Sequence, residues 1–274
     1  MESASTYIQE MLHAHNEVRT KPQKYATVLE ERAELFDGIY YKVPGQTKIR
    51  TKEGVKGVEH AIEFLKNQDP LSKFKLSEEL CMSAQDHAND IGTNDGRGHT
   101  GSDGSKHSER IKRYADKSGW SGENISYKCG EAMDVVLRFI IDDGKEARGH
   151  RSNIFKEECK YLGVAMHDHP TWTNCVVIDY AEGVKPKGDG SKVKSKHTPS
   201  EFKPYTEETK DTPSESHKTS TSSSSHEVPD NYKKRKSKTH TKTKGSKVTT
   251  TKTTTYTLED GSHKVFTDVT TTTK

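Results

Sequence analysis

The sequence predicts an α+β domain over residues 1–185, followed by a disordered basic tail. Three observations lead to this prediction. Apolar residues recur at helical spacing through most of the first part, and two late segments alternate as β-strands. Both tryptophans and all four cysteines lie in the same part. The rest of the chain is rich in Lys, Ser, Thr and His, so it cannot bury enough apolar surface to offset the entropy of an ordered chain.

The charges divide at the same place as the composition. Residues 1–185 hold 26 Lys and Arg residues against 30 Asp and Glu residues, and the remaining residues hold 18 against 11. The first part is therefore mildly acidic and the tail is basic. A segment of about 185 residues is long enough to bury one sizeable core, which agrees with a single folded domain.

Helices are predicted for most of the first half of this domain. Apolar spacing predicts a helix over residues 8–18 that ends before a proline, and a second, shorter helix over 25–35. Residues 37–57 are expected to form an exposed loop or hairpin. A further apolar stripe predicts a helix around 58–65. Ser77 is a favourable N-cap for the next helix, because two glutamates follow it in the first turn.

The second half of the domain combines a loop, helices and strands. Residues 96–105 are rich in Gly, Asp and Ser and are expected to form a loop, and residues 122–127 are strand-like. Apolar residues at helical spacing over 132–143 predict a helix that a glycine stops. Two alternating segments, 161–166 and 175–181, predict antiparallel strands around a connecting loop. Late antiparallel strands favour an α+β domain over a parallel-sheet nucleotide-binding fold.

Several common signals are missing from the sequence. Residues 1–7 are polar and the following segment is amphipathic, so no signal peptide is recognised, and no apolar run approaches the length of a membrane span. The cysteines have no CxxC spacing and are too few for a disulfide scaffold. These features favour an intracellular, reducing location. The chain also contains no glycine-rich phosphate loop, HExxH or GxSxG motif.

Five short strings in the domain are jointly specific. HNEVR begins at His15, GHTGSDGS at Gly98, GENI at Gly122, GHRSNI at Gly149 and YLGVA at Tyr161. In this order and spacing the set resembles the CAP superfamily (SCP-like), named for cysteine-rich secretory, antigen 5 and pathogenesis-related proteins, in its microbial and protist form. The resemblance covers residues 7–183. It implies a three-layer α–β–α sandwich with a central cleft.

The resemblance also implies that two histidines and two acidic residues line the cleft. Carried over by motif, the histidines are His99 and His150 and the first acidic residue is Glu123. The second acidic residue of the family follows an aromatic residue by three positions, which nominates Asp142. The helical stripe instead places Asp143 on the apolar face, so both aspartates remain candidates. Most family members have Glu here, and Asp is shorter.

Such a cluster can bind a metal ion. Two neutral imidazoles can hold Zn²⁺ or another divalent cation and leave positions open for water, so His99 and His150 are the candidate metal ligands. The carboxylates would then fix the imidazole tautomers from outside the metal shell. Without a metal, they could hold protonated histidines and make the cleft pH-sensitive. No nucleophile is convincingly placed, so no catalytic residue is assigned.

The other histidines of the domain have simpler interpretations. His15 and His87 lie on apolar helical faces and are expected to be core histidines with satisfied hydrogen bonds. His167 and His169 lie in the predicted loop between the two late strands and are expected to be solvated.

Three classes of function follow from these residues. The resemblance implies a binding module that takes a lipid, sterol or protein ligand in the cleft, because members of the family are mostly binding and signalling proteins. One alternative is a metal-dependent hydrolase built on His99, His150 and Glu123. The other is an intracellular scaffold that its basic, Thr-rich tail localises. Family members are typically secreted, which conflicts with the missing signal peptide and leaves the location open.

The tail is interpreted in two parts. Residues 186–244 are expected to form a disordered linker rich in Lys, Ser and Thr. Its basic cluster at 233–238 fits a nuclear-import signal, a nucleic-acid contact, an anionic-surface patch or a solubilising run. No aromatic residues are interleaved there, which disfavours a nucleic-acid partner. Residues 245–274 hold two Thr-rich runs around an Asp-Gly turn and predict a β-hairpin that docks on a protein or an anionic surface.

Overall fold

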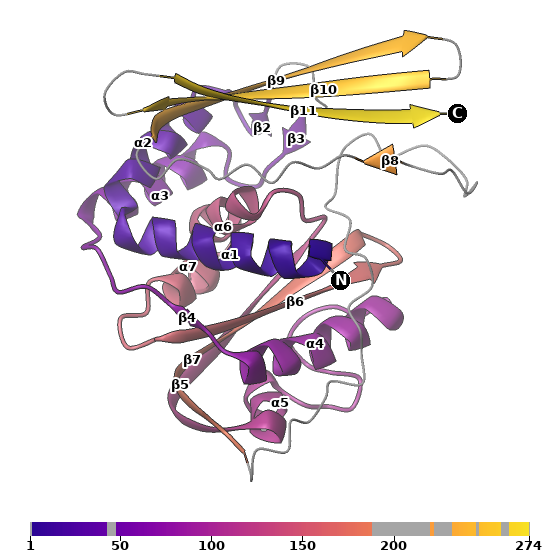
Figure 1. Ribbon diagram of the computed structural model, residues 1–274. Helices are drawn as coiled ribbons and strands as arrows, with labels where there is room; N and C mark the ends of the chain where they lie inside the picture. The colour runs from indigo at the N-terminus through magenta and orange to yellow at the C-terminus, as the bar shows by residue number, and fades with distance from the viewer. Residues whose placement is uncertain are drawn as a thin grey trace. The chain divides into compact units, whose positions relative to one another are not determined.

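The computed structural model describes residues 2–42, 48–187, 220–221, 232–244, 247–258 and 263–273 (Figure 1). The chain divides into two units, Met1–Lys210 and Asp211–Lys274. Each unit is described by itself below. No helix in the described ranges is long and apolar enough to cross a membrane.

The first unit begins with helices and very short strands. Pro22 starts the second helix directly, because its fixed φ and missing N–H suit the first helical position. The elements are α1 (Glu2–Thr20), α2 (Pro22–Ala33), β1 (Phe36–Asp37), β2 (Tyr40–Tyr41), β3 (Ile49–Arg50) and α3 (Val55–Asn67).

The rest of the unit supplies the main sheet and the helices around the site. Ser77 caps the longest of these helices, and its Oγ accepts a hydrogen bond from the Leu80 N–H at 3.3 Å, as the sequence predicts. The elements are β4 (Lys75–Leu76), α4 (Glu78–Thr93), α5 (His107–Tyr114), β5 (Ala115–Tyr127), α6 (Ala132–Ile141), α7 (Gly149–Ile154), β6 (Tyr161–His169) and β7 (Thr173–Pro186).

The main sheet has four strands in the order β4-β6-β7-β5. The pair β4–β6 is parallel, whereas β6–β7 and β7–β5 are antiparallel. The strand β5 therefore lies at an edge of the sheet. This position matters for the site, because β5 carries the GENI string.

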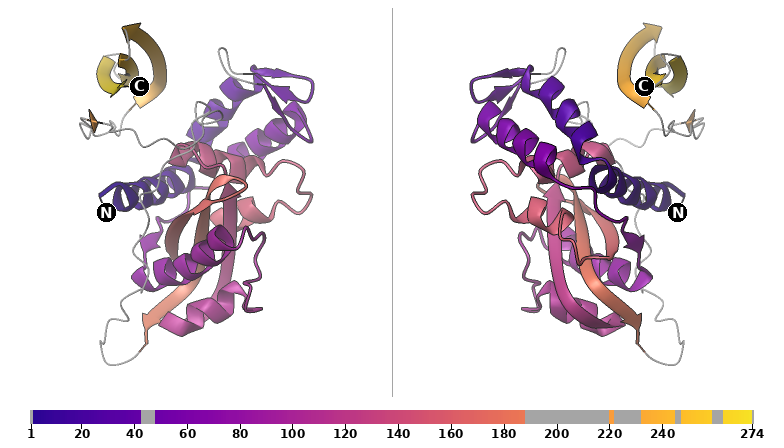
Figure 2. Two further views of the ribbon diagram at one scale, coloured as in Figure 1. Left: turned by 90° about the vertical axis from the view of Figure 1, so that its right-hand side faces the viewer. Right: turned by 90° about the vertical axis from the view of Figure 1, so that its left-hand side faces the viewer.

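Helices cover both faces of this sheet. Along β7, Val176, Ile178 and Tyr180 join the large core that α1, α2, α3 and α6 share. The alternate residues Cys175 and Val177 pack against α4 on the other face. Figures 1 and 2 show the sheet between α1 and α6 on one side and α4 and α5 on the other. The α+β prediction is therefore confirmed, with helices on both faces of the sheet.

A buried arginine ties α1 to the segment after α7. Arg19 is 0% exposed, and its guanidinium lies 4.1 Å from the centre of the Phe74 ring. Its donors bind backbone carbonyls before β4, at the end of α7 and in the segment after α7. They reach the carbonyl oxygens of Ser72 at 2.8 Å, Ile154 at 2.6 Å, Lys156 at 3.0 Å and Cys159 at 3.3 Å.

The hairpin between β6 and β7 is tighter than the sequence predicts. The two strands pair as far as His169 and Thr173, so the predicted eight-residue loop is mostly strand. His169 is only 3% exposed, because its Nε2 binds the Gly96 carbonyl at 3.0 Å and its Nδ1 lies 3.3 Å from an Asp95 carboxylate oxygen. The expectation that His169 is solvated was wrong. The polar residues His-Asp-His suggested a loop, but they form the end of β6, and the loop after α4 covers His169.

The second unit contains a sheet in the order β8-β11-β10-β9. Its strands are β8 (Ser220–Thr221), β9 (Tyr232–Lys244), β10 (Lys247–Leu258) and β11 (His263–Thr273). β10 and β11 pair antiparallel from Lys247 opposite Thr273 to Thr257 opposite His263, where the sequence predicts a hairpin. The predicted Asp-Gly turn lies outside the described residues.

The linker prediction was wrong for residues 232–244. These residues form β9, which pairs antiparallel with β10. Thr and Lys alternate along this segment, and the high strand propensity of Thr supports a strand that low compositional complexity concealed. The remaining linker residues, 188–219 and 222–231, lie outside the described residues.

Candidate functional site

The first half of the site is a buried carboxylate bound to an accessible imidazole. His99 lies in the loop after α4, and its Nδ1 donates to Glu123 Oε1 at 2.8 Å. The His99 side chain is 54% exposed, whereas Glu123 in β5 is buried. Arg110 on α5 donates to the other oxygen, Glu123 Oε2, at 2.7 Å and also to the His99 carbonyl at 3.2 Å. Arg110 therefore fixes both members of the pair.

The surroundings keep Glu123 ionised. Burial by itself raises the pKa of this carboxyl group. The hydrogen bond from His99 and the charge of Arg110 outweigh burial, and they hold the pKa of Glu123 below its ordinary value. The imidazole of His99 therefore faces a carboxylate, which requires the N–H to sit on Nδ1.

The second half of the site repeats this arrangement. His150 is the second residue of α7, and its Nδ1 donates to Asp142 Oδ1 at 2.7 Å. The backbone N–H of His150 donates to Asp142 Oδ2 at 3.0 Å. Asp142 is buried and follows the last residue of α6 in a left-handed conformation, with φ of 52°. This turn of the backbone brings its carboxylate to the start of α7.

Asp143 lies elsewhere. Its two oxygens accept hydrogen bonds from the backbone N–H groups of Lys52 and Glu53, both at 2.8 Å. The stripe argument that placed Asp143 on the apolar face assumed that the helix continues to that residue. The helix ends at Ile141, so the helical spacing no longer applies to Asp143.

The two pairs meet at the edge strand β5. Alternation along the strand puts Glu123 on the side of α4 and α5 and Asn124 on the other side. Asn124 Nδ2 donates to the His150 carbonyl at 3.1 Å and to the Tyr180 hydroxyl at 3.2 Å. Asn153 on α7 donates to the Glu123 carbonyl at 3.3 Å and to Asn124 Oδ1 at 2.8 Å. Two adjacent residues of β5 therefore anchor both histidines.

The two Nε2 nitrogens of the site each carry a lone pair that could bind a metal ion or accept a hydrogen bond. Neither His99 Nε2 nor His150 Nε2 has a hydrogen-bond partner within the described ranges. In these ranges no group of three or more His, Cys, Asp or Glu side chains is arranged to hold a metal ion. Each carboxylate binds the Nδ1 side of its ring, so Nε2 is the unbound ring nitrogen of both histidines among the described residues.

The histidines expected in the core lie in the core. His15 is fully buried, with Nδ1 2.7 Å from the Met11 carbonyl and Nε2 2.8 Å from the Tyr180 hydroxyl. Burial lowers the pKa of His15 to about 4, so it is neutral. His87 is also buried, and its Nε2 donates to the Gly98 carbonyl at 2.7 Å. His87 Nδ1 has no partner within the described residues, so this histidine is less completely satisfied than expected.

Two residues near the site were missed in the sequence. Arg110 holds Glu123, and Asp179 on β7 is the cross-strand partner of Glu123. Arg110 lies on α5, and its buried contact with Glu123 depends on the fold. Asp179 did carry a signal, because it is an acidic residue inside an otherwise apolar strand.

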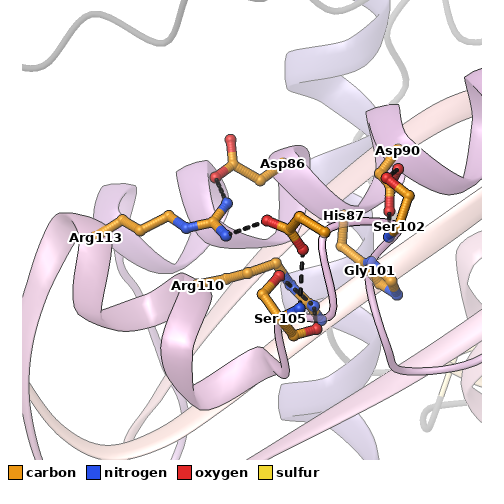
Figure 3. A pocket seen from close by; sticks show the side chains of 9 residues that line it. Asp86, His87, Asp90, Gly101, Ser102, Ser105, Arg110 and Arg113 are labelled. Carbon is orange, nitrogen blue, oxygen red and sulfur yellow. Dashed lines mark hydrogen bonds and ion pairs between the residues drawn. The ribbon is translucent and has the colours of Figure 1, made fainter.

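A polar cavity of about 140 Å³ adjoins the site through Arg110 (Figure 3). Its walls are charged groups that largely bind one another. Arg113 donates to Asp86 at 3.0 Å and to Asp103 at 2.7 Å, and Ser102 donates to Asp90. The lining residues are Asp86, His87, Asp90, Gly101, Ser102, Asp103, Ser105, Arg110 and Arg113.

Comparison with known proteins decides the family. The model of the CAP family, described as the cysteine-rich secretory protein family, matches residues 12–180. The chain belongs to the CAP family. All five strings that carry the resemblance lie within the matched residues of this CAP domain.

Two solved structures are similar to parts of this CAP protein. An outer surface protein from Borrelia burgdorferi is 18% identical, with a TM-score of 0.36, and the match covers 48% of this chain and 91% of that one. An extracellular protein containing an SCP domain from Bacillus anthracis is 17% identical, with a TM-score of 0.32, covering 46% of this chain and 37% of that one. No curated protein matches the chain.

Proposed function

We propose that the protein is a binding module whose cleft holds a divalent cation such as Zn²⁺ beside His99 and His150 and takes a lipid, sterol or protein ligand. One observation carries this proposal. Each imidazole gives its Nδ1–H to a buried carboxylate, Glu123 or Asp142, and leaves its Nε2 without a partner among the described residues.

This geometry prepares both rings for a cation. A carboxylate at Nδ1 fixes the tautomer, orients the ring and makes Nε2 a stronger electron-pair donor. Two such nitrogens supply half of a tetrahedral shell, and water or a ligand oxygen completes it. A bound ion would supply positive charge and open coordination positions. The chain's own contribution is to hold the two rings, through Arg110 at Glu123 and through the left-handed turn at Asp142.

Calorimetric titration of the full chain with Zn²⁺ tests this proposal. We expect wild type to show a binding event that disappears when His99→Ala and His150→Ala are combined. His60→Ala is the control, because His60 is exposed on α3 and belongs to neither histidine–carboxylate pair. All three proteins keep the histidines of the tail, so binding there cancels in the comparison. Equal heats from wild type and the double variant would remove the cation from the proposal.

The two adjacent aspartates give this titration a sharper arm. Asp142→Asn removes the carboxylate behind His150, and loss of such a partner typically weakens metal binding about 10–100-fold. Asp143→Asn removes the same charge one residue away, where the carboxylate serves Lys52 and Glu53, so binding should stay near that of wild type. Equal weakening by both substitutions would point to net charge rather than to the carboxylate behind His150.

The second unit favours a role at an anionic lipid surface. β9 is an edge strand, and successive even positions along it are Lys234, Lys236, Lys238, His240, Lys242 and Lys244. Because strand residues alternate between faces, these positions form one row with a spacing of about 6.6 Å. A lysine near an anionic bilayer contributes about 1 kcal/mol of attraction, so the row suits a lipid surface.

A composition-matched variant tests the row. Exchanging neighbours (Lys236→Ser with Ser237→Lys, Lys238→Thr with Thr239→Lys, Lys242→Thr with Thr243→Lys) keeps the charge and moves three lysines to the other face. We expect several-fold weaker sedimentation of the full chain with phosphatidylserine vesicles, and no binding of either protein to neutral vesicles. If the exchanged chain binds as well as wild type, only total charge matters. If the exchange weakens binding to nucleic acid but leaves binding to vesicles unchanged, the lipid assignment is wrong.

A further inference from the structure

Asp179 is an acidic residue at a fully buried position in the middle of β7. Its exposure is 0%, and its neighbours on the same face, Val177 and Ala181, pack in apolar clusters against α4 and α5. Its partner across the strands is Glu123. Directly opposite residues of an antiparallel pair share a face, with Cβ atoms about 5 Å apart. Two carboxyl groups therefore share one buried space beside the candidate site.

Hydrogen bonding around Asp179 is incomplete for a carboxylate. Ser83 Oγ on α4 donates to Asp179 Oδ2 at 2.6 Å. The other oxygen, Oδ1, is buried and has no partner within the described part of the chain. An ionised carboxylate can only accept, and leaving one of its oxygens without a donor in an apolar interior is strongly unfavourable. A neutral acid instead carries an O–H, for which the adjacent Glu123 carboxylate is an acceptor.

The charges around the pair lead to the same answer. The guanidinium of Arg110, itself buried, binds Glu123 and so neutralises one carboxylate. His87 supplies no charge, because burial lowers its pKa. The side chain of His99 is more than half exposed, so solvent screens any charge on it. One buried guanidinium beside two carboxyl groups leaves one of them without a counter-ion.

The elements packed against Asp179 offer no other cation among the described residues. The thiol of Cys81 on α4 is neutral, since burial raises its pKa to about 11. On β6 the partner of Asp179 is Gly163, which has no side chain. A Cβ at Gly163 would lie 2.2 Å from backbone atoms of α4, so the helix backbone lies directly over this part of the sheet. Burial, followed by the charge of Glu123, raises the pKa of Asp179 well above its usual range.

We propose that Asp179 is a neutral carboxylic acid at neutral pH, that its O–H donates to Glu123, and that Asp179 is thereby a positioning residue for His99. Glu123 then receives three donors, from Asp179, Arg110 and His99. A carboxylate fixed in this way holds the His99 ring with N–H at Nδ1 and the lone pair at Nε2. The protonation of Asp179 is a property of the metal-free protein, so its tests do not depend on whether a cation binds to the histidines.

The protonation state is measured directly on the wild-type full chain without added metal. With ¹³C-labelled aspartate carboxyl groups, we expect one Asp resonance to keep the chemical shift of a protonated acid at pH 7. That resonance should vanish in Asp179→Asn and persist in Asp168→Asn, where the substituted residue is exposed on the same hairpin. If every wild-type Asp carboxyl resonance is that of a carboxylate at pH 7, the inference is overturned, even if the variant does not fold.

The pH dependence of stability gives a second readout. In wild type the unfolded chain releases the Asp179 proton above pH about 3.9 while the folded chain keeps it, so folding becomes less favourable as pH rises. The amide that replaces this acid in Asp179→Asn cannot ionise in either state. The ratio of the unfolding equilibrium constants, wild type over Asp179→Asn, should therefore rise towards tenfold per pH unit above pH about 4. Parallel pH profiles for the two proteins would contradict the inference.

The positioning role is read at the His99 ring. ¹⁵N spectra of the metal-free protein distinguish the two imidazole tautomers. Asp179→Asn keeps a donor for Glu123 and should keep the N–H of His99 on Nδ1, whereas Asp179→Val removes that donor and should mix the tautomers. If the two variants give the same His99 spectrum as wild type, Asp179 does not position the ring.

Discussion

Replacing Arg110 by methionine should lower the free energy of unfolding by about 3–5 kcal/mol, the usual cost of breaking a buried ion pair by removing one partner. Arg110 and Glu123 are both buried, and their contact distance is 2.7 Å. Methionine fills much of the space of the arginine stem but provides neither charge nor donor. The carboxylate that holds His99 then loses its cation in an apolar interior. Urea unfolding of the full chain at pH 7 measures the loss.

The pH dependence of this loss has a definite sign. Arg110 helps to lower the pKa of Glu123 in the folded state, so the pair stabilises the fold above the unfolded pKa of about 4.3 and less so as pH falls. The difference between wild type and Arg110→Met should therefore shrink in acid.

A neighbouring arginine provides the control. Arg113 also pairs with carboxylates, but its side chain is 41% exposed, and solvent screens such pairs. Arg113→Met should cost much less than Arg110→Met. Equal losses from the two substitutions would show that the buried pair does not carry the stability assigned to it.

Arg19→Met should lower the free energy of unfolding by about 2–6 kcal/mol and leave part of the chain unfolded at 37 °C. Four backbone carbonyls accept from this one guanidinium, and the contacts with Ile154 and Cys159 are buried. Each buried polar group left unpaired costs about 1–3 kcal/mol, which is a large share of the total stability of about 5–15 kcal/mol that is typical of a domain. Circular dichroism and urea unfolding of the full chain measure the effect, and Arg50→Met at an exposed position is the control.

The same substitution connects the core to the site. Arg19 binds the carbonyl of Ile154, the last residue of α7. His150 is the second residue of the same short helix. At a lower temperature, where part of Arg19→Met folds, the NMR signals of His150 should shift more than those of His99. An Arg19→Met protein that is as stable as Arg50→Met would contradict the role given to this residue.

The sequence predicted the parts of this molecule that depend on local pattern. The helical stripes, the Ser77 cap and the ordered strings indicated the α+β fold and the family, which the structure and the family match confirm. The nomination of His99, His150 and Glu123 followed family motifs rather than any local pattern. The structure places these residues in contact, while their role in binding stays a prediction.

The rest depended on features that periodicity does not contain. Helix α6 ends at Ile141 because Asp142 adopts a left-handed conformation, and the apolar stripe alone gave no sign of this. The contact of Arg110 with Glu123 and the pairing of Asp179 with Glu123 depend on the fold, which brings α5, β5 and β7 together. The strand over 232–244 was not predicted, because its composition of mostly Lys and Thr was interpreted as that of a disordered linker.

Gly163 has no Cβ, and this allows α4 to lie close enough to the sheet to bury Asp179. Because α4 lies directly over the backbone there, even a methyl group would push the helix outward and let water reach Asp179. Water would then replace the Asp179 O–H as a hydrogen-bond donor to Glu123. Glu123 would be held less firmly, and so would the His99 ring that it binds. Gly163 beneath α4 and the His99–Glu123 pair are therefore coupled through Asp179, so that a change at Gly163 alters the restraint on the His99 ring.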